Sequence, residues 1–189
     1  VEVDFSELSS GICSYYVIAP AECSSNLSRF DGIKYGYRSE GEKDITNLYM
    51  NTRSDGFGDE VKKRILIGTH VLSAGFYDAY YLQAQKVRRM IKVKFESFFK
   101  DVDLIFMPTT LDQAFEKNRK SDDPNRMYKE DLLTIPANLA GLPAISFPNG
   151  FKNNLPIGGQ LIGKYFGEDL LLNTTNKIQE VTDWHKMTP

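Results

Sequence analysis

The amino-acid sequence predicts an α/β fold in which helices flank a mixed or parallel β-sheet. Short runs rich in β-branched and aromatic residues, which are typical of strands, alternate with longer segments whose apolar residues recur every three or four positions. Strands that are separated by helices favour an α/β arrangement over an all-α or all-β one. The 189 residues contain no internal repeat and no long linker, so residues 1–189 are expected to form a single unit.

Four helices are expected in the first hundred residues, after one short strand. Residues 14–20 predict the strand because they are β-branched or aromatic, and Pro20 or Ala21 suits the first position of a helix. Asp44 and Ser73 are candidate N-caps, since a side-chain oxygen at that position accepts a bond from an unpaired helical N–H group. The expected helices cover residues 20–30, 44–53, 59–72 and 73–99.

The second half of the chain is expected to hold the remaining strands and a closing amphipathic helix. Strands are expected at 102–107, 144–147 and 157–162, and Pro148, Asn149 and Gly150 have the composition of a turn. The polar residues 111–128 predict a surface loop. A short helix is expected at 127–133, a turn or helix at 136–140, and the closing helix at 168–181.

Composition and charge exclude few functions. The net charge of −2 gives no electrostatic reason to expect that the chain alone binds nucleic acid. No apolar run approaches the roughly 20 residues that a membrane-spanning helix needs, and no signal peptide is recognised. The chain begins at Val1 rather than at Met, as a fragment or a processed product would. Cys13 and Cys23 are expected to be reduced thiols, and His70 and His185 lack partners at the spacing of a metal site or a catalytic triad.

The long helix expected at 73–99 carries a basic face. The face is made of Lys86, Arg88, Arg89, Lys92 and Lys94. Such a face is most often solvated, and a contact with RNA or with another protein of an assembly is the alternative.

Six segments follow one another in the order that is found in a known enzyme family. They cover residues 15–38, 56–65, 73–81, 123–124, 135–143 and 182–186. This pattern resembles the amidase signature family, and within it the A subunits of the glutamyl-tRNA(Gln)/aspartyl-tRNA(Asn) amidotransferases. The resemblance implies that the chain is the C-terminal portion of the amidase signature fold, with an incomplete mixed sheet whose edge is unpaired. The N-terminal catalytic portion, with the family's Ser-Ser-Lys set, would lie upstream, so no catalytic residue is expected in this chain.

Arg64 lies beside the apolar stripe of the helix expected at 59–72. At about 100° per residue it falls roughly 60° from Val61. A basic residue at the flank of a buried stripe either pairs with a structural carboxylate or faces a cleft, and position alone favours the ion pair. The resemblance implies instead that Arg64 binds the α-carboxylate of glutamine, which a guanidinium can hold through two parallel N–H bonds.

Asp131 and Tyr15 are the other two glutamine ligands that the resemblance implies. Asp131 would bind the α-ammonium group, and its alternative role is an N-cap for a turn over residues 132–135. Tyr15, rather than Tyr16, would add a hydroxyl hydrogen bond; its alternative is a buried strand residue whose hydroxyl is satisfied elsewhere. Buried ions need partners, so Arg64 and Asp131 should face one cleft with side-chain ends on the order of 4–8 Å apart.

The resemblance also implies an activity and partners for the complete enzyme. It would hydrolyse glutamine and supply ammonia, while a partner subunit uses ATP and Mg to activate glutamate on tRNA(Gln) or aspartate on tRNA(Asn). The implied partners are the B and C subunits of the amidotransferase, glutamine and the misacylated tRNA, in a bacterial cytoplasm or an organelle matrix. No cofactor is expected in this chain.

Two alternatives remain open at this stage. A stand-alone amidase that acts on a neutral amide would not need opposite charges at the two ends of its substrate. A truncated chain would only bind or aggregate. Ser9, Ser10, Ser24 and Ser25 superficially resemble a nucleophile loop, but the family's order places the nucleophile upstream.

Overall fold

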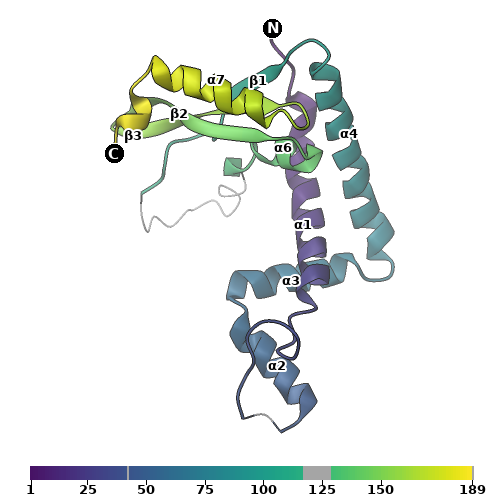
Figure 1. Cartoon of the computed structure of the whole chain (residues 1–189). Coiled ribbons are helices and arrows are strands. Elements are labelled where there is room, and N and C mark those ends of the chain that lie inside the picture. Colours follow the sequence, from purple (N-terminus) through teal and green to yellow (C-terminus); the bar gives the residue numbers. More distant parts are fainter. Residues whose placement is uncertain (42, 117–128, 189) are drawn as a thin grey trace. The chain divides into compact units, whose positions relative to one another are not determined.

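The structure is a computed structural model that describes residues 1–41, 43–116 and 129–188 (Figure 1). The chain divides into two compact units, one formed by Cys13–Lys86 and the other by Val1–Ile12 together with Val87–Pro189. The expectation that residues 1–189 belong to one domain stays a prediction.

The unit formed by residues 13–86 is helical. Its elements are the greater part of α1 (Gly11–Leu27), α2 (Ile45–Gly56), α3 (Asp59–Val71), the π-helical turn η2 (Tyr77–Tyr81) and the first residues of α4 (Leu82–Phe98). The helices expected at 44–53 and 59–72 are confirmed. Asp44 caps α2 as predicted, because its Oδ2 accepts a bond from the backbone N–H of Asn47 at 3.1 Å.

The strand expected at 14–20 is wrong, because α1 runs through this segment and contains Pro20 in its interior. Ser14, Ile18 and Ala21 are only 4%, 5% and 1% exposed and lie three or four residues apart. Burial of one helical face therefore outweighs the strand propensity of the local composition. Pro20 has no N–H group, so it leaves unmade the helical bond to the carbonyl four residues before it.

α1 and α3 cross in near backbone contact, with Gly68 against Pro20. A Cβ atom at Gly68 would collide with the Pro20 carbonyl oxygen and would lie 2.7 Å from the Cβ of Ser24. The hydroxyls of Ser24 and Thr69 share a hydrogen bond of 2.9 Å across the same crossing. The absence of a side chain at Gly68 thus sets how closely the two helices approach.

Ser73 does not cap the next helix, which corrects the second predicted N-cap. Its hydroxyl donates to the carbonyl of His70 at 2.7 Å, so it serves the end of α3. Gly75 then adopts a φ of 86°, a left-handed conformation that turns the chain before the π-helical turn η2 begins. The helix expected at 73–99 is present as η2 followed by α4.

The other unit contains a small sheet of β1 (Leu104–Pro108), β2 (Ala144–Lys152) and β3 (Leu155–Gly163), in the order β1-β3-β2. All three strands include the segments predicted for them, except that β1 begins two residues later. Both pairings are antiparallel, whereas a mixed or parallel sheet was expected. For β2 and β3 the reason is connectivity, since the short turn that joins them allows only antiparallel pairing.

The turn predicted at Pro148 to Gly150 is also wrong. β2 continues through this segment with a shift in register between Pro148 and Phe151. The chain reverses instead at Asn153 and Asn154, whose φ angles are 54° and 61°. Two consecutive residues with positive φ form the turn that best matches the twist of a hairpin, and Asn tolerates that conformation.

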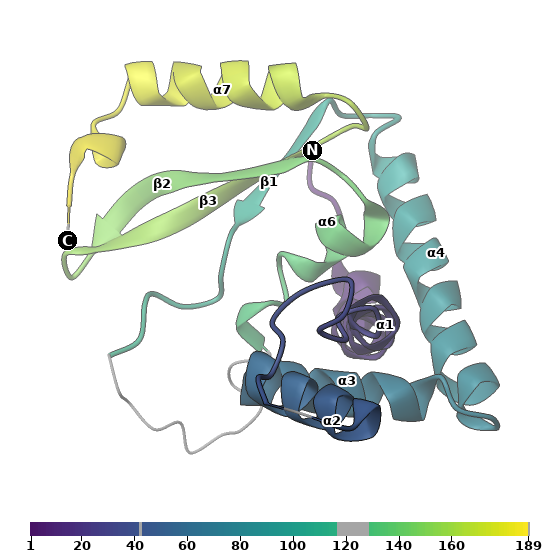
Figure 2. The same cartoon turned by 60° about the horizontal axis from the view of Figure 1, so that its bottom comes forward.

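The helix predicted at 168–181 is confirmed as α7 (Glu168–Glu180) and covers one face of the sheet (Figure 2). Leu171 of α7 packs with Phe147 and Leu161 of the strands, and all three are buried. The turn or helix expected at 136–140 is the short helix α6 (Ile135–Ala140). Buried Gln160 donates to the carbonyl of Leu133 at 3.1 Å, which ties β3 to the segment that precedes α6.

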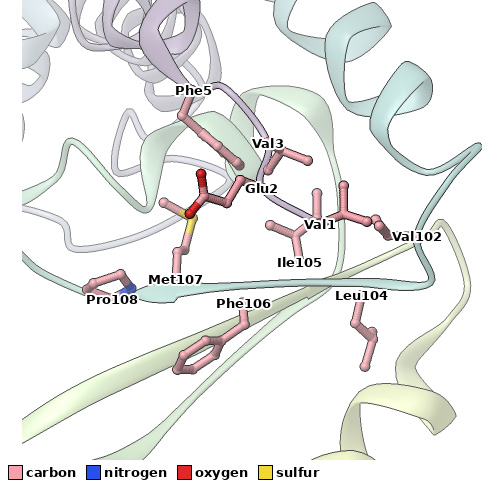
Figure 3. Close-up of a pocket in the computed structure, with 10 residues that line it drawn as sticks. All are labelled: Val1, Glu2, Val3, Phe5, Val102, Leu104, Ile105, Phe106, Met107 and Pro108. Carbon is pink, nitrogen blue, oxygen red and sulfur yellow. The ribbon is translucent and has the colours of Figure 1, made fainter.

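β1 and β2 are the edge strands of this sheet, and among the described residues no further strand pairs with either. Residues 1–3 and Phe5 lie beside β1 and line, with it, an open cavity of about 610 Å³ (Figure 3). Side chains alternate along β1, so Ile105 and Met107 face the N-terminal residues while Phe106 points to the opposite face. The small sheet with open edges agrees with the expected incomplete α/β fold.

Replacing Gly68 with Ala is expected to destabilise the protein by about 1–3 kcal/mol, because the added methyl group must push α1 and α3 apart. Gly58→Ala is the control, since a Cβ atom there meets nothing within 4 Å; it should change stability by less than about 1 kcal/mol. Urea unfolding followed by circular dichroism measures both. Equal stability of the two variants would contradict the close crossing.

Candidate functional site

The crossing of α1 and α3 places two of the three predicted ligands together. Tyr15 precedes Pro20 by five residues in α1, and Arg64 precedes Gly68 by four residues in α3. A hydrogen bond with the Tyr15 hydroxyl is one of the interactions that raise the pKa of Arg64. The rings of Tyr15 and Tyr16 lie edge to face, with centroids 5.1 Å apart.

Arg64 also has a carboxylate partner, as its position alone favoured, although the sequence reasoning did not identify that partner as Glu60. Its Nε donates to Oε1 of Glu60 at 3.0 Å, one turn earlier in α3. This hydrogen bond is the largest cause of a raised pKa of Arg64; burial acts in the opposite direction, and the nearby Tyr15 hydroxyl adds to the rise. An arginine is charged throughout the physiological range in any case. The signal was present in the sequence, because an acidic residue four positions before an arginine is a common helical pair.

The ion pair and the cleft-facing interpretation of Arg64 are compatible. Glu60 contacts Nε, and a guanidinium has five N–H donors. The side chain of Arg64 is 36% exposed and that of Glu60 is 63% exposed, so solvent or a ligand can reach the pair. An exposed pair of this kind contributes little to stability.

Asp131 belongs to the unit formed with residues 87–189, and lies in the turn that leads into α6. Its main-chain carbonyl accepts bonds from the N–H groups of Thr134 and Ile135, the latter at 3.0 Å. Thr134 occupies the N-cap position of α6, and the alternative role of the Asp131 side chain, as an N-cap for the turn over residues 132–135, stays a prediction. Arg64 and Asp131 fall in different units, so their facing one cleft, and the roles of Arg64, Asp131 and Tyr15 in binding glutamine, stay predictions.

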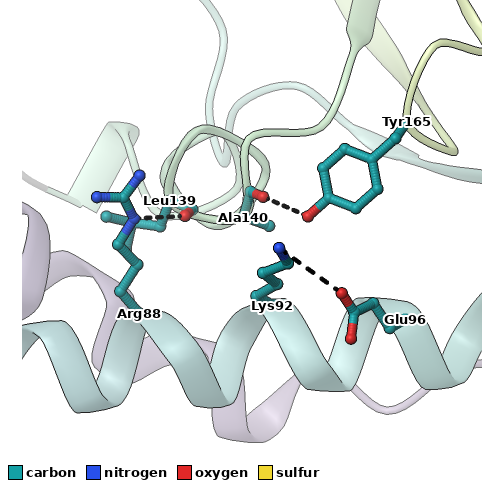
Figure 4. A network of polar contacts seen from close by, with 6 residues as sticks. All are labelled: Arg88, Lys92, Glu96, Leu139, Ala140 and Tyr165. Carbon is teal, nitrogen blue, oxygen red and sulfur yellow. Dashed lines mark hydrogen bonds and ion pairs between the residues drawn. The ribbon is translucent and has the colours of Figure 1, made fainter.

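Part of the basic face of α4 is engaged within the protein (Figure 4). Arg88 Nε donates to the carbonyl of Leu139 at 3.0 Å, and the Tyr165 hydroxyl donates to the carbonyl of Ala140 at 2.7 Å. Both carbonyls lie at the C-terminal end of α6, where the helix cannot satisfy them itself. Lys92 pairs with Glu96 at 3.8 Å and lies over the ring of Tyr165.

Two kinds of site are not observed in the described part of the chain. Within residues 1–41, 43–116 and 129–188 no group of three or more His, Cys, Asp or Glu side chains is placed to hold a metal ion. In the same residues, no helix combines the length and the apolar character needed to cross a membrane.

Sequence comparison supplies the family. A family model described as Amidase matches residues 1–172. The chain belongs to the amidase family. Among similar curated proteins are A subunits of glutamyl-tRNA(Gln) amidotransferases. The one from Hahella chejuensis is 58% identical over 188 residues, which is 100% of this chain and 39% of that protein. The one from Pseudomonas aeruginosa is 54% identical over 188 residues, again covering 39% of its length. The chain therefore spans 39% of the length of these curated relatives.

Solved structures share the fold of this chain. Among solved A subunits of glutamyl-tRNA(Gln) amidotransferases, that of Thermotoga maritima matches with a TM-score of 0.57 and 42% identity, over 86% of this chain and 30% of its own. A 6-aminohexanoate cyclic dimer hydrolase matches with a TM-score of 0.68 over 100% of this chain and 38% of its own. At 19% identity this second likeness concerns the fold alone. The predicted family and fold class are confirmed.

Replacing Arg88 with Ala should destabilise this member of the amidase family by about 1–3 kcal/mol, because the partly buried carbonyl of Leu139 loses its donor. Arg89→Ala is the matched control, since Arg89 is the next residue of α4 and is exposed. Chemical denaturation of the two variants measures the difference. A purely solvated basic face would make the two substitutions equivalent.

Proposed function

We propose that this chain is the C-terminal portion of the glutamine-hydrolysing subunit of a tRNA-dependent amidotransferase. The observation that carries the proposal is that a chain matching A subunits of glutamyl-tRNA(Gln) amidotransferases over its full length holds a partly exposed arginine, Arg64, whose carboxylate partner takes only its Nε–H group. In this proposal the chain recognises glutamine, and the Ser-Ser-Lys set that cleaves its amide lies in the remaining part of the longer protein.

The chemistry of glutamine explains why an arginine is needed. Free glutamine carries a carboxylate and an ammonium group at one end and a neutral amide at the other. Arg64, which stays charged, supplies the cation for the carboxylate, and the Tyr15 hydroxyl adds a hydrogen bond beside it. Asp131 supplies the anion for the ammonium group. Holding this end of the molecule places the amide at the nucleophile.

Released ammonia is used by a partner in the same proposal. The B and C subunits complete the assembly, and one of these partners uses ATP with Mg to activate the glutamate carried on tRNA(Gln), or the aspartate on tRNA(Asn). The curated relatives are bacterial proteins named as subunits, which supports an assembly in a bacterial cytoplasm. The chain itself takes no cofactor.

A stand-alone amidase is the second candidate. It is supported by the fold that the chain shares with the cyclic dimer hydrolase. That likeness does not extend to substrate, whereas Arg64 is suited to a substrate with a carboxylate. A neutral amide would leave the charge of Arg64 without a partner in the substrate.

The purified 189-residue chain is expected to release no ammonia from glutamine, because in this proposal the Ser-Ser-Lys set lies in the remaining part of the longer protein. Loss of the nucleophile machinery of a hydrolase costs about 10⁶-fold in rate. The complete protein, assembled with its partners, should release ammonia under the same conditions, measured by a coupled glutamate dehydrogenase assay. Turnover by the 189-residue chain would point to Ser9, Ser10, Ser24 or Ser25 as the nucleophile.

In the complete assembly, Arg64→Ala should lower kcat/KM for glutamine by about 10²-fold or more, since removal of one partner of a charged pair costs about 2–5 kcal/mol. Lys63→Ala is the matched control, because Lys63 is the neighbouring basic residue of α3 and is exposed. Amidation driven by added ammonium chloride bypasses glutamine and should be unchanged in both variants. An unchanged kcat/KM for glutamine in Arg64→Ala would overturn the assignment.

A further inference from the structure

We infer that Glu60 is a positioning residue for substrate binding, which holds the guanidinium of Arg64 by its Nε side and thereby directs the two Nη groups to the ligand carboxylate. This inference rests on the proposed function, in which Arg64 binds the carboxylate of glutamine. It assigns a second residue of α3 to the same site and states how that residue acts.

The contact between Glu60 and Arg64 fixes one side of a planar group. A guanidinium can hold a carboxylate in two ways, through Nε and one Nη, or through both Nη groups. Glu60 Oε1 accepts the Nε–H of Arg64 at 3.0 Å, so the side-on mode is already used within the protein. The end-on pair of Nη groups is the mode left for a second carboxylate.

The restraint is local and comes from α3 itself. Residues four apart lie one above the other on a helix, so Glu60 can reach Arg64 without any movement of the backbone. A long arginine side chain loses rotamer entropy when it is ordered. A partner that orders the side chain before the ligand arrives removes that cost from binding.

The ion pair between Glu60 and Arg64 is expected to add little to the stability of the protein. The Glu60 side chain is 63% exposed, and its partner lies one helical turn away on the same helix. Exposed ion pairs of this kind contribute little to the free energy of folding. Both Asp59 and Glu60 are acidic residues in the first turn of α3, so each has the same favourable interaction with the helix N-terminus. The two differ in partner, because Asp59 pairs with Lys62 at 3.1 Å.

This difference makes Asp59 a matched control. Asp59→Ala and Glu60→Ala each remove one acidic side chain from the first turn of α3 and one ion pair within the helix. Only Glu60→Ala releases the Nε of Arg64. Glu60→Gln keeps an oxygen that can accept the Nε–H bond while it removes the charge, so it separates positioning from electrostatics.

The experiment measures glutamine-dependent ammonia release by the complete assembly carrying each variant. Glu60→Ala should raise KM for glutamine about tenfold with little change in kcat, since a misplaced binding group weakens binding before it alters the chemistry. Glu60→Gln should stay within about threefold of the wild type, and Asp59→Ala within about twofold. In an Arg64→Ala background, Glu60→Ala should have no further effect, as expected for residues that act through one another.

Each contrary outcome has a distinct meaning. A normal KM in Glu60→Ala, with a raised KM in Arg64→Ala, overturns the positioning role and leaves the proposed function in place. A lowered KM in Glu60→Ala would mean that Glu60 competes with the ligand carboxylate, which also overturns it. A normal KM in Arg64→Ala overturns the proposed function itself. Equal losses in Asp59→Ala and Glu60→Ala, accompanied by equal shifts in melting temperature, would assign both residues to helix stability and overturn the positioning role.

Discussion

The close crossing of α1 and α3 is the constraint on which the candidate site depends. Two helices normally keep their axes 8–10 Å apart because side chains fill the space between them. At this crossing Gly68 offers no side chain, and the Pro20 carbonyl of α1 occupies the position that a Cβ atom would take. The hydroxyl pair of Ser24 and Thr69, 2.9 Å apart, joins the same two helices. If α1 or α3 moved away from the crossing, the residues of the two helices that face each other there would move apart.

Tyr15 and Arg64 are such a pair. Each lies about one turn before the crossing point in its own helix, so a small separation between the backbones keeps the tyrosine hydroxyl within hydrogen-bonding reach of the guanidinium. Glu60 adds a restraint from within α3. The arginine is thus held by its own helix, and Tyr15 of α1 lies close enough to affect its pKa. A binding group with restraints of this kind loses little further freedom when a ligand arrives.

Periodic segments were predictable from sequence, whereas elements decided by tertiary burial or by a single backbone angle were not. The sequences of α2, α3 and α7 contain a recognisable N-cap residue or a periodic apolar stripe. Their observed positions agree with the prediction to within a few residues. α1 was missed because its composition is that of a strand, and only the buried positions of Ser14, Ile18 and Ala21 show a helical face. The hairpin turn was misplaced because Pro148 and Gly150 have high turn propensity. The chain reverses instead at Asn153 and Asn154, whose φ angles are positive. Arg64 and Tyr15 came from a family resemblance, and no local pattern would have shown that a crossing brings them together.

The interaction of Arg64 with Glu60 shows that an arginine can form an ion pair within the protein and still be able to bind a ligand. From position alone, an arginine beside an apolar stripe was expected either to pair with a carboxylate or to face a cleft. The structure gives it a carboxylate, but an exposed one on the same helix that takes a single N–H group. A buried partner that used both edges of the guanidinium would have closed the site to ligands. A partner on Nε alone keeps the charge in place, raises the pKa of the arginine and leaves donors for a second anion. The number of donors that a partner occupies, rather than the existence of the partner, therefore decides whether such an arginine can also bind a ligand.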